Sequence, residues 1–346
     1  MRIAVATVLV PFISGGAELM TQGLCSALRE AGHAVELVAM PFRFGPAAAV
    51  SATMQAWAEQ DFDRFDCGAI DEVIALKFPA YYLKHHAKRV WLMHQHRSVY
   101  ELFDTAYGER SDNPQAVALK AAITSQDTQS LSEAYKVFTI SPTVSERLLR
   151  FNQIESQPLL QPPAHAELFF SRDPLPYIFV PSRLESLKRQ ELLIRAMSMV
   201  QEPVFAVIAG EGGQRGHLES VVAELGLHNR VRFVGRVSEA TMRSHYAHAL
   251  GVFFGPLQED YGFITLEAML SSRPVITCSD SGGPTHFVRD GHTGFVAEPD
   301  ADSVARAINR LWANRAQAIA MGSHGRQLYA DLGISWNHVV DALLAD

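Results

Sequence analysis

Two glutamates with a glycine between them form the most informative constellation in the sequence. Glu259 and Glu267 stand eight positions apart, and Gly262 lies where a helical pattern begins. A glycine there lets a ligand approach the backbone closely, and the free N–H groups of the first helical turn attract an anion such as a diphosphate. Glu267 falls about one turn further along. Its carboxylate can accept hydrogen bonds from the hydroxyls of a ribose attached to that diphosphate.

Basic side chains that offset the charge of a diphosphate lie earlier in the chain. Arg183 and Lys188 follow the apolar run 177–180. A guanidinium binds phosphate oxygens as a fork, whereas an ammonium acts as a point charge. Each charge-assisted contact contributes about 1.5–3 kcal/mol, so the two side chains would affect both binding and the departure of a leaving group.

Strand-length apolar runs alternate with helical patterns along the whole chain and must position these side chains. The runs lie at 3–10, 33–39, 73–76, 90–93, 137–140, 177–180, 204–209, 231–234, 251–254 and 275–277. Such a series predicts parallel sheets covered by helices, with ligands at the carboxyl ends of the strands. Prolines crowd the segment 158–176 and indicate a hinge. The sequence therefore predicts an α/β protein with two Rossmann-like, doubly wound domains facing a central cleft.

Several well-known fingerprints are absent. The segment 210–215 has two glycines of a dinucleotide motif, but Arg215 stands in place of the third, which disfavours a nicotinamide cofactor. No P-loop, H-E-x-x-H or G-x-S-x-G sequence occurs. The three cysteines, Cys25, Cys67 and Cys278, have neither disulfide nor zinc-site spacing.

The composition and charge exclude several further classes of protein. The 346 residues are 48% apolar and 19% charged with a net charge of −7, which argues against disorder and against nucleic acid as a partner. No apolar run reaches membrane-spanning length, and the first residues lack a leader pattern. We expect a cytoplasmic protein, with the inner face of the membrane as an alternative place of work.

Four motifs in order resemble the signature of retaining glycosyltransferase family 4. They are Arg183 with Lys188, Glu259 to Glu267 with Gly262, Gly282-Gly283-Pro284, and Asp290-Gly291-x-Thr293-Gly294. The resemblance covers nearly the whole chain and is stronger from about 177 to 300 than before 170. It implies the GT-B fold and transfer of a sugar from a nucleotide-diphosphate donor with retention at the anomeric carbon. It also implies that no metal or other cofactor is needed.

The resemblance assigns roles in the second half of the chain. Arg183 and Lys188 would hold the diphosphate and stabilise it as it leaves, Glu259 would contact the donor sugar, and Glu267 would bind the ribose. The other donor-binding candidates border the nucleobase or the diphosphate. They are Gly210, Gly212, Arg236, Val237, Tyr261, Gly262, Phe263 and Ile264. Where the family usually has an acid two residues after the proline of Gly-Gly-Pro, this chain has His286, which alters a local hydrogen bond.

Acceptor-binding candidates lie in the first half. Gly15 and Gly16 resemble the family's glycine loop near the phosphate and acceptor, and a simple strand-to-helix turn is the alternative. His94 matches a histidine at the far side of the donor sugar, which makes it a catalytic candidate; a structural role is equally compatible. His96 and Arg97 are further acceptor-binding candidates. On a strand, His94 and His96 would point to one face as in a metal site, but no third ligand is identifiable and we expect no metal.

Three segments follow from this hypothesis. Residues 1–168 would form an N-terminal acceptor-binding domain and 169–322 a C-terminal donor-binding domain. Residues 323–346 would form a C-terminal helix that packs back on the N-terminal domain. Within 77–97, basic and aromatic residues occur without an acid. They suggest either a peripheral membrane contact or, as we favour, a solvated helix face beside a buried strand.

The resulting hypothesis is a hexosyltransferase. It would move a sugar from a nucleotide sugar, UDP favoured over GDP, to the hydroxyl of a sugar or glycolipid in polysaccharide or glycolipid assembly. The acceptor would attack from the face on which the diphosphate leaves, because no residue is placed as a double-displacement nucleophile. Two alternatives stay open: a nucleotide-sugar epimerase or hydrolase on the same fold, and a non-catalytic nucleotide-sugar-binding subunit.

Overall fold

The chain folds into two compact units, which are described separately. The computed structural model describes residues 1–12, 15–64 and 68–345, so Cys67 and the last residue lie outside it. Unit 1 comprises Met1–Ala164 and Ser335–Asp346, and unit 2 comprises His165–Ile334. Among the described residues, no helix combines the length and the apolar character that a bilayer crossing requires.

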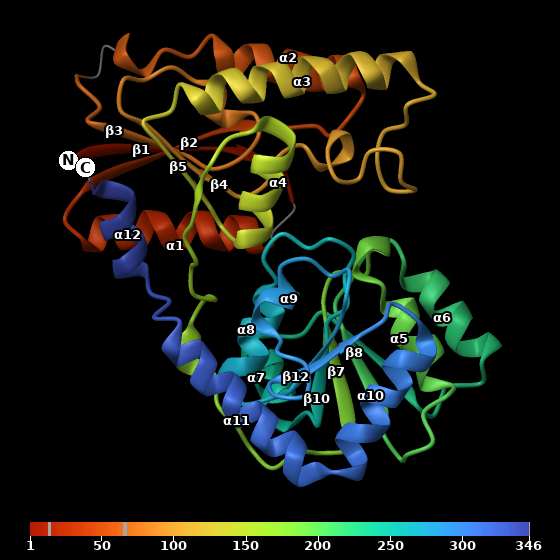
Figure 1. Ribbon diagram of the computed structural model, residues 1–346. Coiled ribbons are helices and arrows are strands. Elements are labelled where there is room, and N and C mark those ends of the chain that lie inside the picture. The colour runs from red at the N-terminus through yellow and green to blue at the C-terminus, as the bar shows by residue number, and fades with distance from the viewer. Residues whose placement is uncertain (13–14, 65–67, 346) are drawn as a thin grey trace. The chain divides into compact units, whose positions relative to one another are not determined.

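Unit 1 contains a parallel six-stranded sheet in the order β2-β1-β3-β4-β5-β6. In Figure 1, α2 and α3 lie on one side of this sheet and α1 and α12 on the other. Its strands are β1 (Arg2–Leu9), β2 (Ala34–Pro41), β3 (Glu72–Ala75), β4 (Lys88–Leu92), β5 (Lys136–Thr139) and β6 (Gln157–Pro158). Its helices are α1 (Gly16–Glu30), α2 (Ala47–Ala58), α3 (Pro114–Ser132), α4 (Pro142–Asn152) and α12 (Trp336–Leu344), with short 3-10 turns η1 (Phe62–Arg64), η2 (Ala80–Tyr82) and η3 (Arg97–Val99).

The C-terminal helix α12 is part of unit 1. Trp336 packs edge-to-face on Trp91 of β4, with ring centroids 6.2 Å apart, and lies against Gly23 of α1. The carbonyl of Ala345 accepts a hydrogen bond of 2.7 Å from Lys136. These contacts explain why the last residues leave unit 2 and complete unit 1.

Unit 2 contains a second parallel six-stranded sheet, in the order β12-β11-β10-β7-β8-β9. Its strands are β7 (Tyr177–Pro181), β8 (Phe205–Ala209), β9 (Val231–Gly235), β10 (Gly251–Phe253), β11 (Val275–Cys278) and β12 (Gly294–Ala297). Its helices are α5 (Gln190–Met197), α6 (Arg215–Glu224), α7 (Glu239–His248), α8 (Phe263–Leu270), α9 (Pro284–Phe287), α10 (Ala301–Ala313) and α11 (Arg315–Asp331), with 3-10 turns η4 (Ala166–Leu168) and η5 (Ser186–Lys188).

Both expected domain boundaries differ from the structure. Unit 1 ends at Ala164 rather than at residue 168. The segment 323–334, expected to pack on the N-terminal domain, lies in unit 2, because α11 places Ala318 and Met321 in the hydrophobic core of that unit. Only the part from Ser335 onward joins unit 1.

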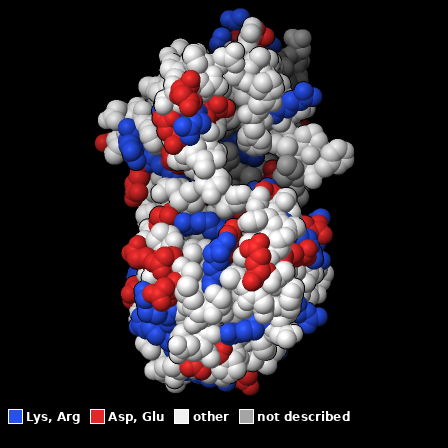
Figure 2. All heavy atoms as spheres, turned by 90° about the vertical axis from the view of Figure 1, so that its right-hand side faces the viewer, with Lys and Arg blue, Asp and Glu red and all other residues white. Residues whose placement is uncertain are grey.

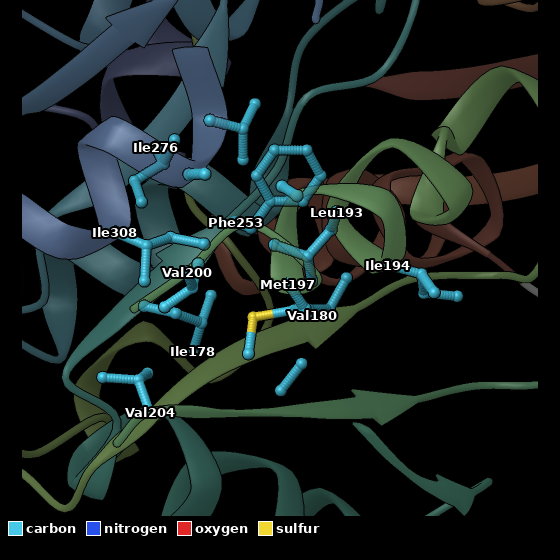
Figure 3. Close-up of a cluster of buried hydrophobic side chains, with 14 of the residues drawn as sticks. Ile178, Val180, Leu193, Ile194, Met197, Val200, Val204, Phe253, Ile276 and Ile308 are labelled. Carbon is cyan, nitrogen blue, oxygen red and sulfur yellow. The ribbon is translucent and has the colours of Figure 1, made fainter. Parts of the chain in front are cut away.

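The unit 2 sheet is buried on both faces, as its continuous apolar runs predict. Ile178 and Val180 of β7 face a cluster built with α5, α6 and α10, part of which is drawn in Figure 3. Tyr177 and Phe179, the alternate residues of the same strand, face a second cluster that contains Tyr246 of α7 and Ala268 of α8. Side chains that alternate between two cores fix the register of β7, and with it the position of the loop that follows.

The basic residues of segment 77–97 do not form a surface patch. The exposed fractions of Lys77, Lys88 and Arg89 are 7%, 3% and 2%. Arg89 pairs with Glu72, and the ammonium of Lys88 donates to the carbonyls of Tyr81 and Leu83. These three side chains point into the fold and are unavailable to solvent or to a membrane surface, whereas Lys84 of the same segment is exposed. On the face shown in Figure 2, basic and acidic side chains are intermixed.

Candidate functional site

Two of the predicted site residues form a direct ion pair in unit 2. The ammonium of Lys188 lies 2.6 Å from Glu259 Oε2, and both side chains are about four-fifths buried. Lys188 follows β7 and Glu259 follows β10, two neighbouring strands of the sheet. The carboxyl edge of the sheet therefore brings together side chains that are 71 positions apart in sequence.

The Gly-Gly-Pro motif holds the loop that carries Glu259. The N–H of Glu259 donates to the carbonyl of Ser281, and its carbonyl accepts from the N–H of Gly283, both at 2.8 Å. Gly282 has a left-handed φ of +71°, and a Cβ there would stand 2.6 Å from the carbonyl oxygen of Glu259. Only glycine allows this approach, so the motif's observed role is to position a catalytic candidate.

Arg189, which no sequence motif singled out, forms hydrogen bonds to three loops of the site. The guanidinium of Arg189 binds both carboxylate oxygens of Asp280 at 2.9 and 2.6 Å. It also donates to the carbonyls of Gly255 and Pro256. The loops after β7, β10 and β11 are thereby joined. The available signal was a second basic residue beside Lys188 and an acid just after a strand.

Arg183 differs from Lys188 and Arg189 because its side chain has no polar partner among the described residues. It is exposed, and its guanidinium forms no ion pair or hydrogen bond with the rest of the described chain. Lys188, by contrast, is already held by Glu259. An incoming anion would therefore find an unpaired guanidinium at Arg183 and an ammonium already paired with Glu259 at Lys188.

The start of α8 has the geometry of an anion site. Gly262 has a φ of +94° and directly precedes the helix. The N–H groups of Phe263 and Ile264, in the first turn, have no acceptor within the helix. Tyr261, expected to bind the donor, is buried and packs edge-to-face on Phe263 and Phe287, so its ring contributes to the packing behind this turn.

Glu267 lies on α8 and is partly buried. Its Oε2 accepts a 2.5 Å hydrogen bond from the hydroxyl of Tyr246 on α7. Burial raises the pKa of Glu267, and the hydrogen bond from Tyr246 partly offsets this. Sequence analysis did not single out Tyr246, because a lone tyrosine in a helix carries no motif.

The glycines after β8 are required by packing. A Cβ at Gly210 would stand 1.9 Å from the carbonyl oxygen of Ser182, and one at Gly212 would stand 2.4 Å from that of Leu184. The loops after β7 and β8 therefore touch backbone to backbone, which fixes the segment that carries Arg183. In the loop after β9, Arg236 is exposed and Val237 is partly buried against the second core cluster.

Gly15 and Gly16 stand at the start of α1 in unit 1. The N–H of Gly15 donates to the carboxylate of Glu18 at 2.9 Å, and Lys77 lies 3.7 Å from the same carboxylate. The hydrogen bond caps the helix, so the turn has a structural reason of its own. Glu18 and Lys77 are polar neighbours of the glycines that the sequence pattern did not reveal.

The three candidates after β4 do not share a strand face. β4 ends at Leu92, before His94, so the expected strand geometry is wrong. His94 Nδ1 lies 2.8 Å from the carbonyl of Gln95, and Arg97 is paired with Glu101. His96 is 4% exposed and lies among aromatic rings. The rings within 6.4 Å of it are Phe42, Phe44 and Phe78.

One group of potential metal ligands occurs among the described residues. Asp63, His85 and His86 place ligand atoms within 4.8 Å of one another. Their atoms are already hydrogen-bonded: His86 Nδ1 to Asp63 at 2.5 Å, and His85 Nε2 to the carbonyl of Ile70 at 3.1 Å. The group is accounted for as a hydrogen-bonded corner of unit 1.

Comparison with known proteins identifies the region that carries this geometry. Residues 167–328, nearly all of unit 2, match the family model described as glycosyl transferases group 1. The resemblance stated from the sequence motifs is thereby confirmed at the level of this group.

Curated relatives match part of this chain over part of their own length. A glycosyltransferase of uncharacterized function from Methanocaldococcus jannaschii is 35% identical over 132 residues, covering 37% of this chain and 34% of the relative. A GDP-mannose-dependent alpha-(1-6)-phosphatidylinositol monomannoside mannosyltransferase from Mycobacterium tuberculosis is 32% identical over 164 residues, covering 44% and 42%. The match thus spans less than half of each relative.

Solved structures extend the likeness to the whole chain at the level of the fold. Anabaena HepE in complex with UDP and glucose aligns over 99% of both chains, with a TM-score of 0.71 and 17% identity. Sucrose-phosphate synthase from Thermosynechococcus elongatus covers 99% and 98%, with a TM-score of 0.76 and 19% identity. With the two parallel sheets, these neighbours confirm the predicted GT-B fold class.

Proposed function

We propose that this chain is a retaining glycosyltransferase that moves a hexosyl unit from a nucleotide-diphosphate sugar to an acceptor hydroxyl. The observation that carries the proposal is the ion pair of Lys188 and Glu259. It supports the proposal because Lys188 could stabilise a leaving diphosphate while the neighbouring Glu259 could contact the sugar. Exposed Arg183 and the first turn of α8 occupy the same carboxyl edge of the unit 2 sheet, which is where open α/β sheets bind their ligands.

The residues would divide the chemistry between two developing charges. Arg183 and Lys188 would stabilise the negative charge on the diphosphate as the bond to the anomeric carbon breaks. Glu259 would orient the donor sugar and face the positive charge that develops on it. The acceptor hydroxyl would attack from the side on which the diphosphate leaves, which retains the anomeric configuration.

The donor and acceptor classes extend this proposal. We favour a UDP-sugar over a GDP-sugar, and an acceptor in polysaccharide or glycolipid assembly. One structural neighbour was solved with UDP and glucose, and one sequence relative is named for GDP-mannose, so an experiment must include both bases. We also propose that the reaction needs no metal ion.

Ligand-dependent thermal unfolding tests the binding step. The protein is heated with UDP, GDP, ADP, dTDP or NAD, each with EDTA and with Mg²⁺. At a hundredfold excess over its dissociation constant, a specific ligand adds about 2.7 kcal/mol and raises the midpoint by several degrees. We expect one nucleoside diphosphate to act in EDTA. A response to NAD alone, or to none of the panel, contradicts the donor site.

Product analysis tests the transfer step. The sugar nucleotide of the base identified above is incubated with and without simple glycoside acceptors, and the products are followed by NMR. We expect a glycoside with the donor's anomeric configuration. Free sugar formed at the same rate without acceptor would indicate a hydrolase. A new sugar nucleotide would indicate an epimerase, and bound but unchanged donor a non-catalytic subunit.

A further inference from the structure

The buried Tyr246 meets the partly buried Glu267, and no sequence motif links the two residues. The tyrosine hydroxyl lies 2.5 Å from Glu267 Oε2, and Tyr246 is 0% exposed. Its ring is held edge-to-face by Phe179, with centroids 5.0 Å apart, and by Phe169 at 5.8 Å. The packed ring holds the hydroxyl in place, so the hydrogen bond restrains the position of the Glu267 carboxylate.

This contact determines what the carboxylate offers to a ligand. A buried carboxylate needs hydrogen-bond donors to remain charged. Tyr246 supplies one donor to one oxygen, and no second side-chain donor to Glu267 occurs among the described residues. Tyr246 therefore leaves acceptor capacity on the carboxylate, which hydroxyl groups of a bound molecule can use.

We propose that Tyr246 is a positioning residue that holds Glu267 as the acceptor for the ribose hydroxyls, and that the pair makes the site select ribonucleoside over 2′-deoxyribonucleoside diphosphates. The inference rests on the proposed function and names the class of donor: UDP- or GDP-linked sugars, to the exclusion of dTDP-linked ones. A deoxyribose leaves the Glu267 carboxylate without one of its donors, and sites built to bind a hydroxyl reject analogues that lack it.

The test compares matched ligands on matched variants. Dissociation constants for UDP and dUDP, and for GDP and dGDP, are measured by calorimetry on the wild type, Tyr246→Phe and Tyr177→Phe. Tyr177 is the control because its buried hydroxyl donates to a backbone carbonyl, that of His245, at 2.7 Å in the same hydrophobic cluster. It therefore reports the cost of losing a structural tyrosine hydroxyl.

We expect the wild type to bind the ribonucleotide at least tenfold more tightly than the deoxyribonucleotide. Tyr246→Phe should lose about tenfold in affinity for the ribonucleotide and little for the deoxyribonucleotide, because Glu267 loses the hydrogen bond that positions it for the ribose. Tyr177→Phe should retain the wild-type ratio. An unchanged ratio in Tyr246→Phe overturns this inference alone, whereas a wild type that binds no nucleoside diphosphate overturns the proposed function.

A double-mutant cycle separates positioning from direct contact. Glu267→Gln should lose the preference for ribose, and Tyr246→Phe combined with Glu267→Gln should bind no more weakly than Glu267→Gln alone. Additive losses would mean that Tyr246 acts on the ligand independently of Glu267, which contradicts a positioning role.

Discussion

The two parallel sheets use their polar side chains differently. In unit 1, the hydroxyls of Tyr81, Tyr82 and Tyr100 all donate to buried Asp127, at 2.8, 2.6 and 2.7 Å. In unit 2, the polar side chains pair at the carboxyl edge of the sheet, as in the contact of Lys188 with Glu259. In unit 1 these polar side chains therefore hydrogen-bond to one another in the interior. In unit 2 they pair at the edge of the sheet, where a ligand could compete for them.

The candidate residues of the two units differ in whether their side chains already have partners within the protein. His96 and Arg97 in unit 1 are committed to an aromatic cluster and to an ion pair. Arg183 in unit 2 is exposed and uncommitted. Residue type alone does not distinguish these cases. What differs is whether the neighbouring elements already supply each side chain with a partner.

Removing the cation at the unit 2 edge should have the largest effect. Lys188→Met leaves Glu259 without its partner and removes a charge from the proposed leaving-group site. We expect the turnover number for sugar transfer to fall about 10²- to 10³-fold. Arg195→Met, which removes one member of an exposed pair with Glu191, is the control and should leave turnover unchanged. Equal turnover in the two variants would contradict the assignment of Lys188.

Acidification should reveal two opposing groups inside unit 1. Burial raises the pKa of Asp127 from 3.8 to about 6, so its contribution to stability is present below pH 4 and lost as the pH rises through 6. Burial lowers the pKa of His96 from 6.5 to about 4, so its contribution is present above pH 6.5 and lost as the pH falls through 4. Each amounts to about 3 kcal/mol.

Single substitutions should separate the contributions of Asp127 and His96 to the pH dependence of the free energy of unfolding. His96→Phe leaves Asp127, so its free energy of unfolding should fall, relative to the wild type, as the pH rises from 4 to 6. Asp127→Asn leaves His96, so its free energy of unfolding should rise, relative to the wild type, over the same pH range. Urea denaturation at several pH values, followed by tryptophan fluorescence, measures both. Wild-type pH profiles in both variants would show that neither group titrates as the buried scaffold requires.

A matched pair of glycines tests the backbone contact that holds Glu259. Gly282 and Gly291 both have a φ of +71°, but only Gly282 would bring a Cβ into contact, with the carbonyl of Glu259. Gly291→Ala should cost about 1–2 kcal/mol of stability for the left-handed backbone alone. Gly282→Ala should cost about 1–3 kcal/mol more and also reduce turnover. Equal costs would mean that the Gly-Gly-Pro segment does not support Glu259.

The smallest effect concerns the attachment of α12. Gly23→Ala puts a Cβ 2.2 Å from the indole of Trp336, whereas Gly216→Ala in α6 meets nothing within 4 Å. Alanine favours a helix over glycine by up to about 1 kcal/mol, so Gly216→Ala should raise the unfolding midpoint slightly. Gly23→Ala should lower it, because the clash outweighs that gain. A rise in both would show that α12 does not need this close contact.

Local patterns were sufficient for the elements and for the motifs at strand ends. Continuous apolar runs predicted β7 and β10, because a strand buried on both faces needs apolar residues on both. The same patterns placed Lys188 and Glu259 after neighbouring strands. The two-residue strand β6 and β12, which begins at Gly294, were not predicted, because neither has a long apolar run. Predicted domain boundaries also shifted, since α11 has helical periodicity whichever unit it packs on.

By itself, the sequence determined the class of fold, the order of its strands along the chain and the motif residues at the carboxyl edge of the unit 2 sheet. Each of these depends on residues near one another in sequence. Tertiary structure alone decided that the basic residues Lys88 and Arg89 are buried, and that Tyr246 meets Glu267. Burial and pairing depend on which elements pack together. That is a sum of many weak contacts between distant segments, which no local spacing encodes.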